Sequence, residues 1–210
     1  MGRGLIVGLF CCAALCRAQT PTAGDPAYTF GVTVVDTTGL EGKIYYIKRD
    51  SQGLPDFGRL KPKGSIYTPE LNVPLQHWRA GFPGVTRRFE WFAIDYRGRF
   101  WIDQPGNYRF ALTSDDGSKL YIDDQVVIDN DGVHPNERRD GRVALTVGAH
   151  RLRVSYFQGP RDGVALILEV ARPGDGYRVF STKDFRPANA EDWKSNDAQA
   201  PDPSSGKRKK

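Results

Sequence analysis

The sequence predicts an all-β protein, an antiparallel β-sandwich or barrel. From Trp101 to Val170, short segments alternate apolar with polar residues, and Gly, Pro, Asp and Asn separate these segments. This period-2 pattern is typical of strands that bury one face. The 210 residues include 23 Gly and 14 Pro, which favour turns over long helices. A coiled coil, a helical bundle and a polytopic membrane protein are therefore disfavoured.

The first half of the chain is less regular than the second. Gly53 to Ser65 is rich in Gly, Pro and Lys, which is typical of a loop. Thr68 to Arg87 holds three Pro and two Gly, so we expect no regular structure there. The strands expected in this half lie around Val32–Val34 and Ile44–Tyr46 and over Glu90–Ile94 and Arg99–Ile102.

The second half carries the clearest strands. We expect turns at Gln104–Asn107, Asp123–Gln125 and Gly148–Ala149, because these segments consist of turn-forming residues between apolar runs. Alternation predicts that the core is formed by the following residues: Tyr108, Phe110, Leu112, Leu120, Ile122, Val143, Leu145, Val147, Leu152, Val154, Tyr156, Val164, Leu166, Leu168 and Val170.

Residues 1–18 have the composition of a secretory signal peptide. Arg3 supplies the basic start, and Leu5–Leu15 is an apolar run too short to span a bilayer. Cleavage is expected before Gln19, and an uncleaved N-terminal anchor is the alternative. All three cysteines of the chain lie in this segment, so the mature protein has no disulfide and no thiolate. We expect a secreted, periplasmic or cell-surface protein without a transmembrane span after signal cleavage.

The flanking segments differ in composition from the strand-rich part. Residues 19–35 are expected to be a linker or a first strand, and residues 187–210 a disordered tail with a basic end. The net charge of +5 comes mainly from the signal segment and from Lys207–Lys210. The remaining chain is close to neutral, which argues against nucleic acid as a partner.

Two adjacent carboxylates, Asp115 and Asp116, end a predicted strand and precede Gly117. Neighbouring residues of a strand point to opposite faces, so both carboxylates converge only where the backbone bends, as Gly117 permits. A hard cation such as calcium favours oxygen ligands gathered in this way. A polar turn whose side chains accept hydrogen bonds from backbone amides remains the alternative.

The run from Tyr108 to Asp131, YRFALTSDDGSKLYIDDQVVIDND, resembles the PA14 domain, named after the anthrax protective antigen. The resemblance continues through Val143–Val170 and, more weakly, to Gly39–Ile47, so it covers residues 36–186. It implies a β-sandwich or barrel-like module that is often carbohydrate-binding and attached to glycosidases, adhesins and toxins. In the lectin-like members, two consecutive Asp joined by a cis peptide hold calcium, and the ion holds sugar hydroxyls.

This resemblance places Asp115 and Asp116 at the calcium-binding positions, with Gly117 beside them. The family's second ligand loop carries a side-chain amide, usually Asn, and backbone carbonyls. Gln158 occupies that position here, although it is longer by a methylene. Asp162 is a candidate to replace it as a metal ligand. The glycines of this loop, Gly159 and Gly163, would let the backbone approach a sugar ring.

Other motifs point to packing rather than chemistry. Asp129–Gly132 resembles part of an EF-hand, but an aligned loop would have Val127 at position 1 and Arg138 at position 12, where carboxylates are needed. Trp91 and Trp101 lie in strand patterns and are expected in the core. Trp78, in an irregular segment, is either an exposed platform for sugar stacking or a packing residue.

The sequence predicts no enzyme, because it contains no G-x-S-x-G, H-E-x-x-H or P-loop motif and its three histidines have no placed partner. The preferred hypothesis is an exported carbohydrate-binding module that recognises a glycan or polysaccharide with the help of calcium. The alternative is a non-catalytic scaffold or protein-interaction module of the cell envelope that binds envelope proteins and no sugar.

Overall fold

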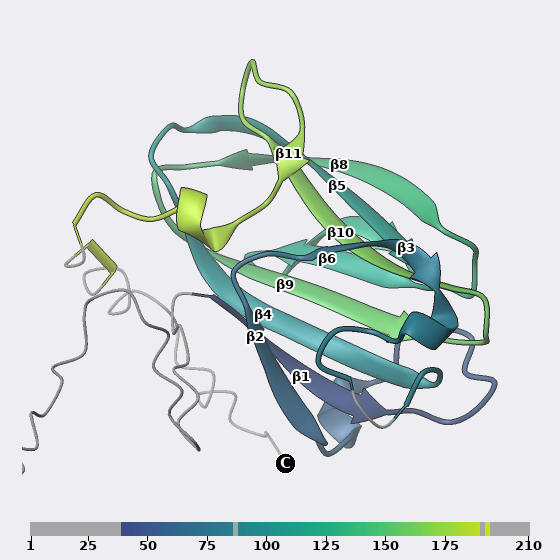
Figure 1. Ribbon diagram of the computed structural model, residues 1–210. Coiled ribbons are helices and arrows are strands. Elements are labelled where there is room, and N and C mark those ends of the chain that lie inside the picture. The colour runs from purple at the N-terminus through teal and green to yellow at the C-terminus, as the bar shows by residue number, and fades with distance from the viewer. Residues whose placement is uncertain (1–38, 86–87, 190–191, 194–210) are drawn as a thin grey trace, which may run out of the picture. The chain divides into compact units, whose positions relative to one another are not determined.

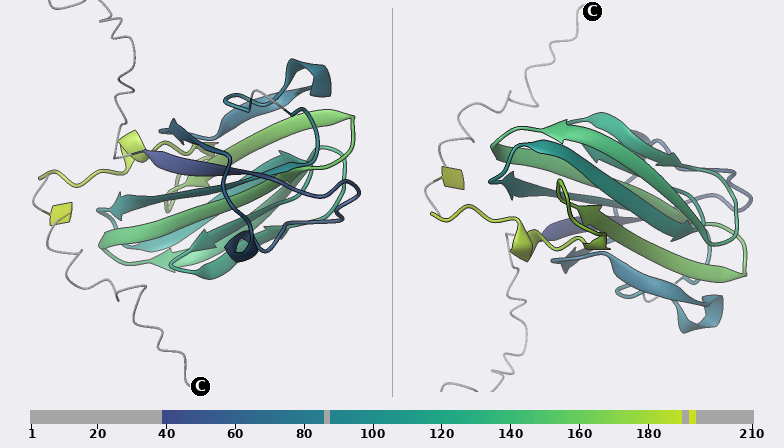
Figure 2. Two further views of the ribbon diagram at one scale, coloured as in Figure 1. Left: turned by 90° about the horizontal axis from the view of Figure 1, so that it is seen from below. Right: turned by 90° about the horizontal axis from the view of Figure 1, so that it is seen from above.

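Two antiparallel β-sheets pack face to face in the computed structural model of the protein (Figures 1 and 2). The structure describes residues 39–85, 88–189 and 192–193, all within the compact unit Val35–Lys210. The predicted signal peptide, the 19–35 segment with the strand expected at Val32–Val34, and tail residues 194–210 lie outside the described residues. None of the described helices is long and apolar enough to cross a membrane.

The first sheet has six strands, with the long β4 and β9 at its centre. These two strands pair over their full length, from Phe92 opposite Gln158 to Ile102 opposite Gly148. The strands in spatial order are β2 (Gly64–Thr68), β1 (Leu40–Tyr46), β4 (Phe92–Ile102), β9 (Gly148–Gln158), β6 (Ser118–Ile122) and β7 (Gln125–Asn130).

The second sheet is built around β10 and β5. Its strands in spatial order are β11 (Arg178–Val179), β10 (Gly163–Ala171), β5 (Gly106–Asp115) and β8 (Glu137–Leu145), and β3 (Asn72–His77) also pairs with β10. Three short 3-10 turns, η1 (Phe57–Arg59), η2 (Trp78–Ala80) and η3 (Thr182–Asp184), lie in the connections. Since β5 belongs to this sheet and β6 to the other, the chain crosses between the sheets at Asp115–Ser118.

The core between the sheets confirms the predicted fold class and most of the predicted inward faces. Tyr108, Phe110 and Leu112 of β5 are fully buried, as are the alternating residues of β9 and β10. Val147 is an exception, because β8 ends at Leu145 and Val147 is 57% exposed in the turn that follows. Alternation therefore predicts the core well inside strands and fails where a strand ends.

Two sequence predictions about the first half are wrong. Thr68–Arg87 contains a strand, β3, in spite of Pro74. A proline is tolerated here because β3 is an edge strand. The pairing of β3 with β10 also shifts in register between Val164 and Leu166, opposite Pro74, so the ladder does not require a backbone N–H from residue 74. The two aromatic strands expected over Glu90–Ile94 and Arg99–Ile102 form one continuous strand, β4.

Candidate functional site

The predicted site residues come from two chain segments that meet at one end of the sandwich. The first is the crossing after β5, which holds Asp115 and Asp116, and the second is the loop from Gln158 to Gly163 that joins β9 to β10. Because β5 and β10 are antiparallel, the end of β5 lies beside the start of β10, and Asp115 pairs with Ala165. The register of the second sheet thus brings the two segments together.

Asp115 is buried, with 4% of its surface exposed, and its peptide bond to Asp116 is cis. Burial raises the pKa of its carboxyl, and the negative charge of Asp162 adds to that shift, while the Asn136 backbone N–H donates to the carboxylate and opposes it. The carboxylate Oδ2 lies so close to Gly163 that a β-carbon there would overlap it. A side chain larger than hydrogen at position 163 would therefore displace Asp115.

Asp116 is 3% exposed and accepts hydrogen bonds from both sides. Its Oδ2 accepts from the Gly159 backbone N–H at 2.8 Å, and its Oδ1 accepts from the His134 N–H at 3.3 Å. Burial nevertheless raises the pKa of its carboxyl to about 6. Neither Asp115 nor Asp116 has a Lys or Arg ion-pair partner among the described residues, so two buried carboxylates lie together without a neutralising side-chain cation.

The Gln158 side chain is fully buried between these carboxylates and its own loop. Its Nε2 lies 3.3 Å from Asp116 Oδ2, 3.4 Å from the Pro160 carbonyl and 3.0 Å from the Gly163 carbonyl. An amide nitrogen has two hydrogens for these three acceptors. The Tyr156 hydroxyl likewise has a single proton for Asp115 O at 2.7 Å and Gln158 Oε1 at 2.6 Å. The cluster therefore holds more acceptor oxygens than donor hydrogens.

This surplus of acceptors fits a hard cation. Calcium takes oxygen ligands from carboxylates, amides and backbone carbonyls. When the Gln158 amide is turned over, its oxygen takes the place of its nitrogen beside Asp116 Oδ2 and the two loop carbonyls. The described residues contain no group of three or more His, Cys, Asp or Glu that could hold a metal. A cation here would thus need amide and carbonyl oxygens to complete its ligands.

The remaining predicted site residues lie around this cluster. Asp162 is exposed, and its carbonyl accepts the Trp78 N–H at 3.1 Å. Gly159 borders Asp116, since a β-carbon there would lie 3.1 Å from Oδ2. Gly117 is buried against the Phe157 ring and the Gly132 backbone. The sequence analysis missed two residues of the site, Tyr156 and His134. Alternation shows that Tyr156 is buried but not that its hydroxyl lies in the site, and no sequence signal predicts that the His134 backbone N–H donates to Asp116.

The aromatic residues are placed differently from the prediction. Trp91 and Trp101 were expected in the core, but both are half-buried. Trp91 has a positive φ of 59° and packs beside a small cluster of Ile47, Ala93 and Phe157, and the Trp101 ring meets Trp193 edge-on at 6.0 Å.

Trp78 is half-buried and lines a pocket next to the loop that joins β9 to β10. The segment that resembles an EF-hand is structural, since Asp129 and Asp131 each lie 3.2 Å from Lys119.

A family model of the PA14 domain matches residues 36–183. The chain belongs to the PA14 domain family. No curated protein matches it. The resemblance inferred from the Asp115–Asp116 segment and its surroundings is thereby confirmed.

Solved structures share the fold of this PA14 domain at low identity. A PA14 sugar-binding domain from an RTX adhesin superposes with a TM-score of 0.57 and 18% identity, covering 69% of this chain and 96% of that one. The PA14 domain of the MpAFP antifreeze protein has a TM-score of 0.58, 16% identity and coverages of 79% and 94%. An anti-sigma factor domain-containing protein has a TM-score of 0.57 and 17% identity, and the match covers 72% of this chain and about half, 49%, of that protein.

Proposed function

We propose that this PA14 domain is an exported module that binds a glycan with the help of calcium at or outside the cell surface. The observation that carries the proposal is the pair of buried carboxylates, Asp115 and Asp116, which have no Lys or Arg partner in the described part of the chain and face an acceptor-rich loop. Asp116, Asp115, the Gln158 amide and the carbonyls of Pro160 and Gly163 would hold the ion. Bound calcium would supply open coordination positions for sugar hydroxyls.

Asp162 has a secondary place in this proposal. Its side chain is exposed at the rim of the loop, and its charge acts on Asp115. It would strengthen the negative field that attracts the cation, or complete the ligands if the Gln158 amide keeps its present orientation. Export is supported by the signal-like composition of residues 1–18, with Arg3 before an apolar run.

Binding rather than catalysis is supported by the state of the histidines. The ring nitrogens of His134 contact the carbonyls of Pro135 and Asn130, and those of His150 contact Asp123 and the Thr146 carbonyl. His77 Nδ1 accepts the Arg79 N–H. Each histidine thus has a structural partner, and none is placed beside Asp115 or Asp116 as a general acid or base with a free nitrogen. The RTX adhesin domain of similar fold is described as sugar-binding, which agrees with this assignment.

The test is calorimetric titration of calcium into chelator-treated protein, followed by a glycan array with and without calcium. We expect saturable calcium binding in the range of about 10⁻⁴–10⁻³ M that is typical of extracellular modules. Asp116→Ala should abolish both calcium binding and glycan retention. Asp103→Ala is the control, because Asp103 is 66% exposed and pairs loosely with Arg172.

If calcium binds but no glycan is retained, the alternative of an envelope scaffold without a sugar ligand is favoured. If the wild-type protein shows no heat of binding and no change in melting temperature, the metal site and the calcium-assisted mechanism are both rejected.

A further inference from the structure

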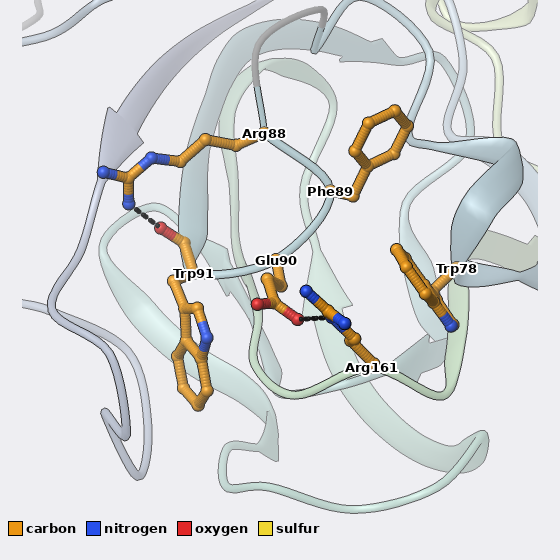
Figure 3. A pocket seen from close by; sticks show the side chains of 6 residues that line it. All are labelled: Trp78, Arg88, Phe89, Glu90, Trp91 and Arg161. Atoms are coloured by element: carbon orange, nitrogen blue, oxygen red, sulfur yellow. Dashed lines mark hydrogen bonds and ion pairs between the residues drawn. The ribbon is translucent and has the colours of Figure 1, made fainter.

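A pocket of about 310 Å³ lies beside the Asp115–Asp116 site, within the range of small-ligand sites of ~300–1,000 Å³. It is formed by η2, by the segment before β4 and by the loop that joins β9 to β10. Figure 3 shows its six lining residues, which are Trp78, Arg88, Phe89, Glu90, Trp91 and Arg161. Phe89 is 48% exposed, so aromatic surface in this pocket is accessible to a ligand.

The pocket and the candidate calcium site share one loop. Arg161 directly follows Pro160, whose carbonyl faces the Gln158 amide, and consecutive Cα atoms are about 3.8 Å apart. The Trp91 N–H donates to the Gln158 carbonyl at 2.9 Å, and the Trp78 N–H donates to a carbonyl of the same loop at 3.1 Å. The pocket walls are therefore hydrogen-bonded to the loop that borders the acidic site.

Positive charge dominates the pocket. Arg161 Nε donates to Glu90 at 2.9 Å, and its guanidinium carbon lies 4.9 Å from the Trp78 ring centre. Figure 3 shows the Arg161 side chain between Glu90 and Trp78. Its terminal nitrogens have no acceptor among the described residues. Arg79 lies over the same indole at 5.3 Å, also without a carboxylate partner in the described chain. Two guanidinium groups thus flank one aromatic ring, opposed by the single carboxylate of Glu90.

The second arginine that lines the pocket, Arg88, has a structural role. Arg88 donates to the carbonyls of Ile47 and Trp91 at 3.3 and 3.1 Å, and its guanidinium carbon lies 4.4 Å from the Tyr46 ring centre. These contacts fix the segment before β4. The pocket wall is therefore held in place before a ligand arrives, which lowers the cost of ordering it on binding.

We propose that this pocket is a second saccharide subsite, which takes an acidic sugar residue next to the residue held at the Asp115–Asp116 site. The proposal rests on the proposed glycan-binding function and extends it to an anionic glycan. The sugar ring packs against Trp78 and Phe89, and its carboxylate or sulfate group accepts hydrogen bonds from the terminal nitrogens of Arg161. A guanidinium matches either group in a two-bond geometry that a lysine or an amide cannot reproduce.

The test uses matched immobilised oligosaccharides in the presence of calcium. One pair is a galacturonate trisaccharide and its methyl ester, and the other is a sulfated galactan oligosaccharide and its desulfated form. The first pair isolates the carboxylate and the second isolates the sulfate. The wild-type mature chain should retain at least one charged member about tenfold or more over its neutral form.

Two variants and a control connect the preference to the pocket. Arg161→Gln should weaken binding of the charged member by about 10- to 100-fold and leave the neutral member unchanged. Glu90→Gln should strengthen binding of the charged member, because it removes the carboxylate that competes for Arg161. Arg142→Gln, which makes the same charge change at an exposed position of β8, should have no effect.

Three results decide against the proposal. Equal loss in Arg161→Gln and Arg142→Gln would show that net charge, not the pocket, attracts the glycan. Calcium-dependent retention of charged and neutral members alike would leave the proposed function standing and reject the acidic subsite. Absence of any retention in calcium would reject both.

Discussion

Replacing Asp116 by Asn should stabilise the calcium-free protein at neutral pH and abolish its response to calcium. Burial raises the pKa of the Asp116 carboxyl from 3.8 to about 6. Because the folded state holds this proton more tightly than the unfolded state, the neutral carboxyl stabilises the fold below about pH 4, and this contribution is lost as the pH rises to 6. At 1.36 kcal/mol per pKa unit, the buried charge costs about 3 kcal/mol above pH 6.

The substitution also removes favourable contacts. Asp116 accepts N–H groups from Gly159 and His134 on different oxygens, and an amide keeps only one of these acceptors. A lost hydrogen bond of this kind costs about 1–2 kcal/mol. The net gain is then about 1–2 kcal/mol, or roughly 2–8 °C in melting temperature for a domain of this size.

Calcium should stabilise the wild type and leave the stability of Asp116→Asn unchanged. With a dissociation constant of about 10⁻⁴–10⁻³ M, about 10 mM calcium stabilises the wild type by about 1.4–2.7 kcal/mol. Asp116→Asn should gain nothing. The assay is thermal unfolding followed by circular dichroism, in chelator and in calcium, at about pH 4 and about pH 8. Asp103→Asn serves as the matched control, since it makes the same charge change at a position that is 66% exposed.

The result that would refute this reasoning is an Asp116→Asn variant that melts below the wild type in chelator at about pH 8 while matching it at about pH 4. A variant that retains the full calcium shift would refute the assignment of Asp116 as a ligand.

Three further predictions concern the fold around the site. The two ring nitrogens of His150 face two acceptors, Asp123 Oδ2 and the Thr146 carbonyl, and although burial lowers the pKa of His150, these hydrogen bonds raise it overall. The protonated ring therefore stabilises the fold, and about 1–2 kcal/mol of stability should be lost as the pH rises above about 6.5. In urea titrations at several pH values, His150→Gln should not show this loss. Gly163→Ala should cost about 1–3 kcal/mol and weaken calcium binding, whereas Gly176→Ala, with open space around it, should do neither in the same melts and titrations. Trp193→Ala should lower the melting temperature by roughly 2–4 °C, and an unchanged value would show that its ring contact with the sandwich contributes nothing.

The sequence by itself determined the fold class and identified the two carboxylates of the acidic turn. Period-2 alternation is a local property of each strand, so Tyr108, Phe110 and Leu112 identify the inward face of β5 without knowledge of its partners. Asp115 and Asp116 are adjacent in the chain. The motif around them carries the resemblance to the PA14 domain, which the family-model match over residues 36–183 confirms. Alternation does not predict where a strand ends, as the exposed Val147 shows, because the end of a strand depends on where its neighbouring strand stops.

Only the tertiary structure decided what surrounds that turn. The contact between Gln158 and Asp116 joins residues 42 positions apart, and the ion pair between Arg161 and Glu90 joins residues 71 positions apart. Such contacts depend on the order and register of the strands, which the residues of one segment do not specify. The same holds for the burial that raises the pKa of Asp116, since it arises from packing of the loop between β9 and β10 against the crossing between the sheets. Local patterns name the groups, and the sheet register decides which of them meet.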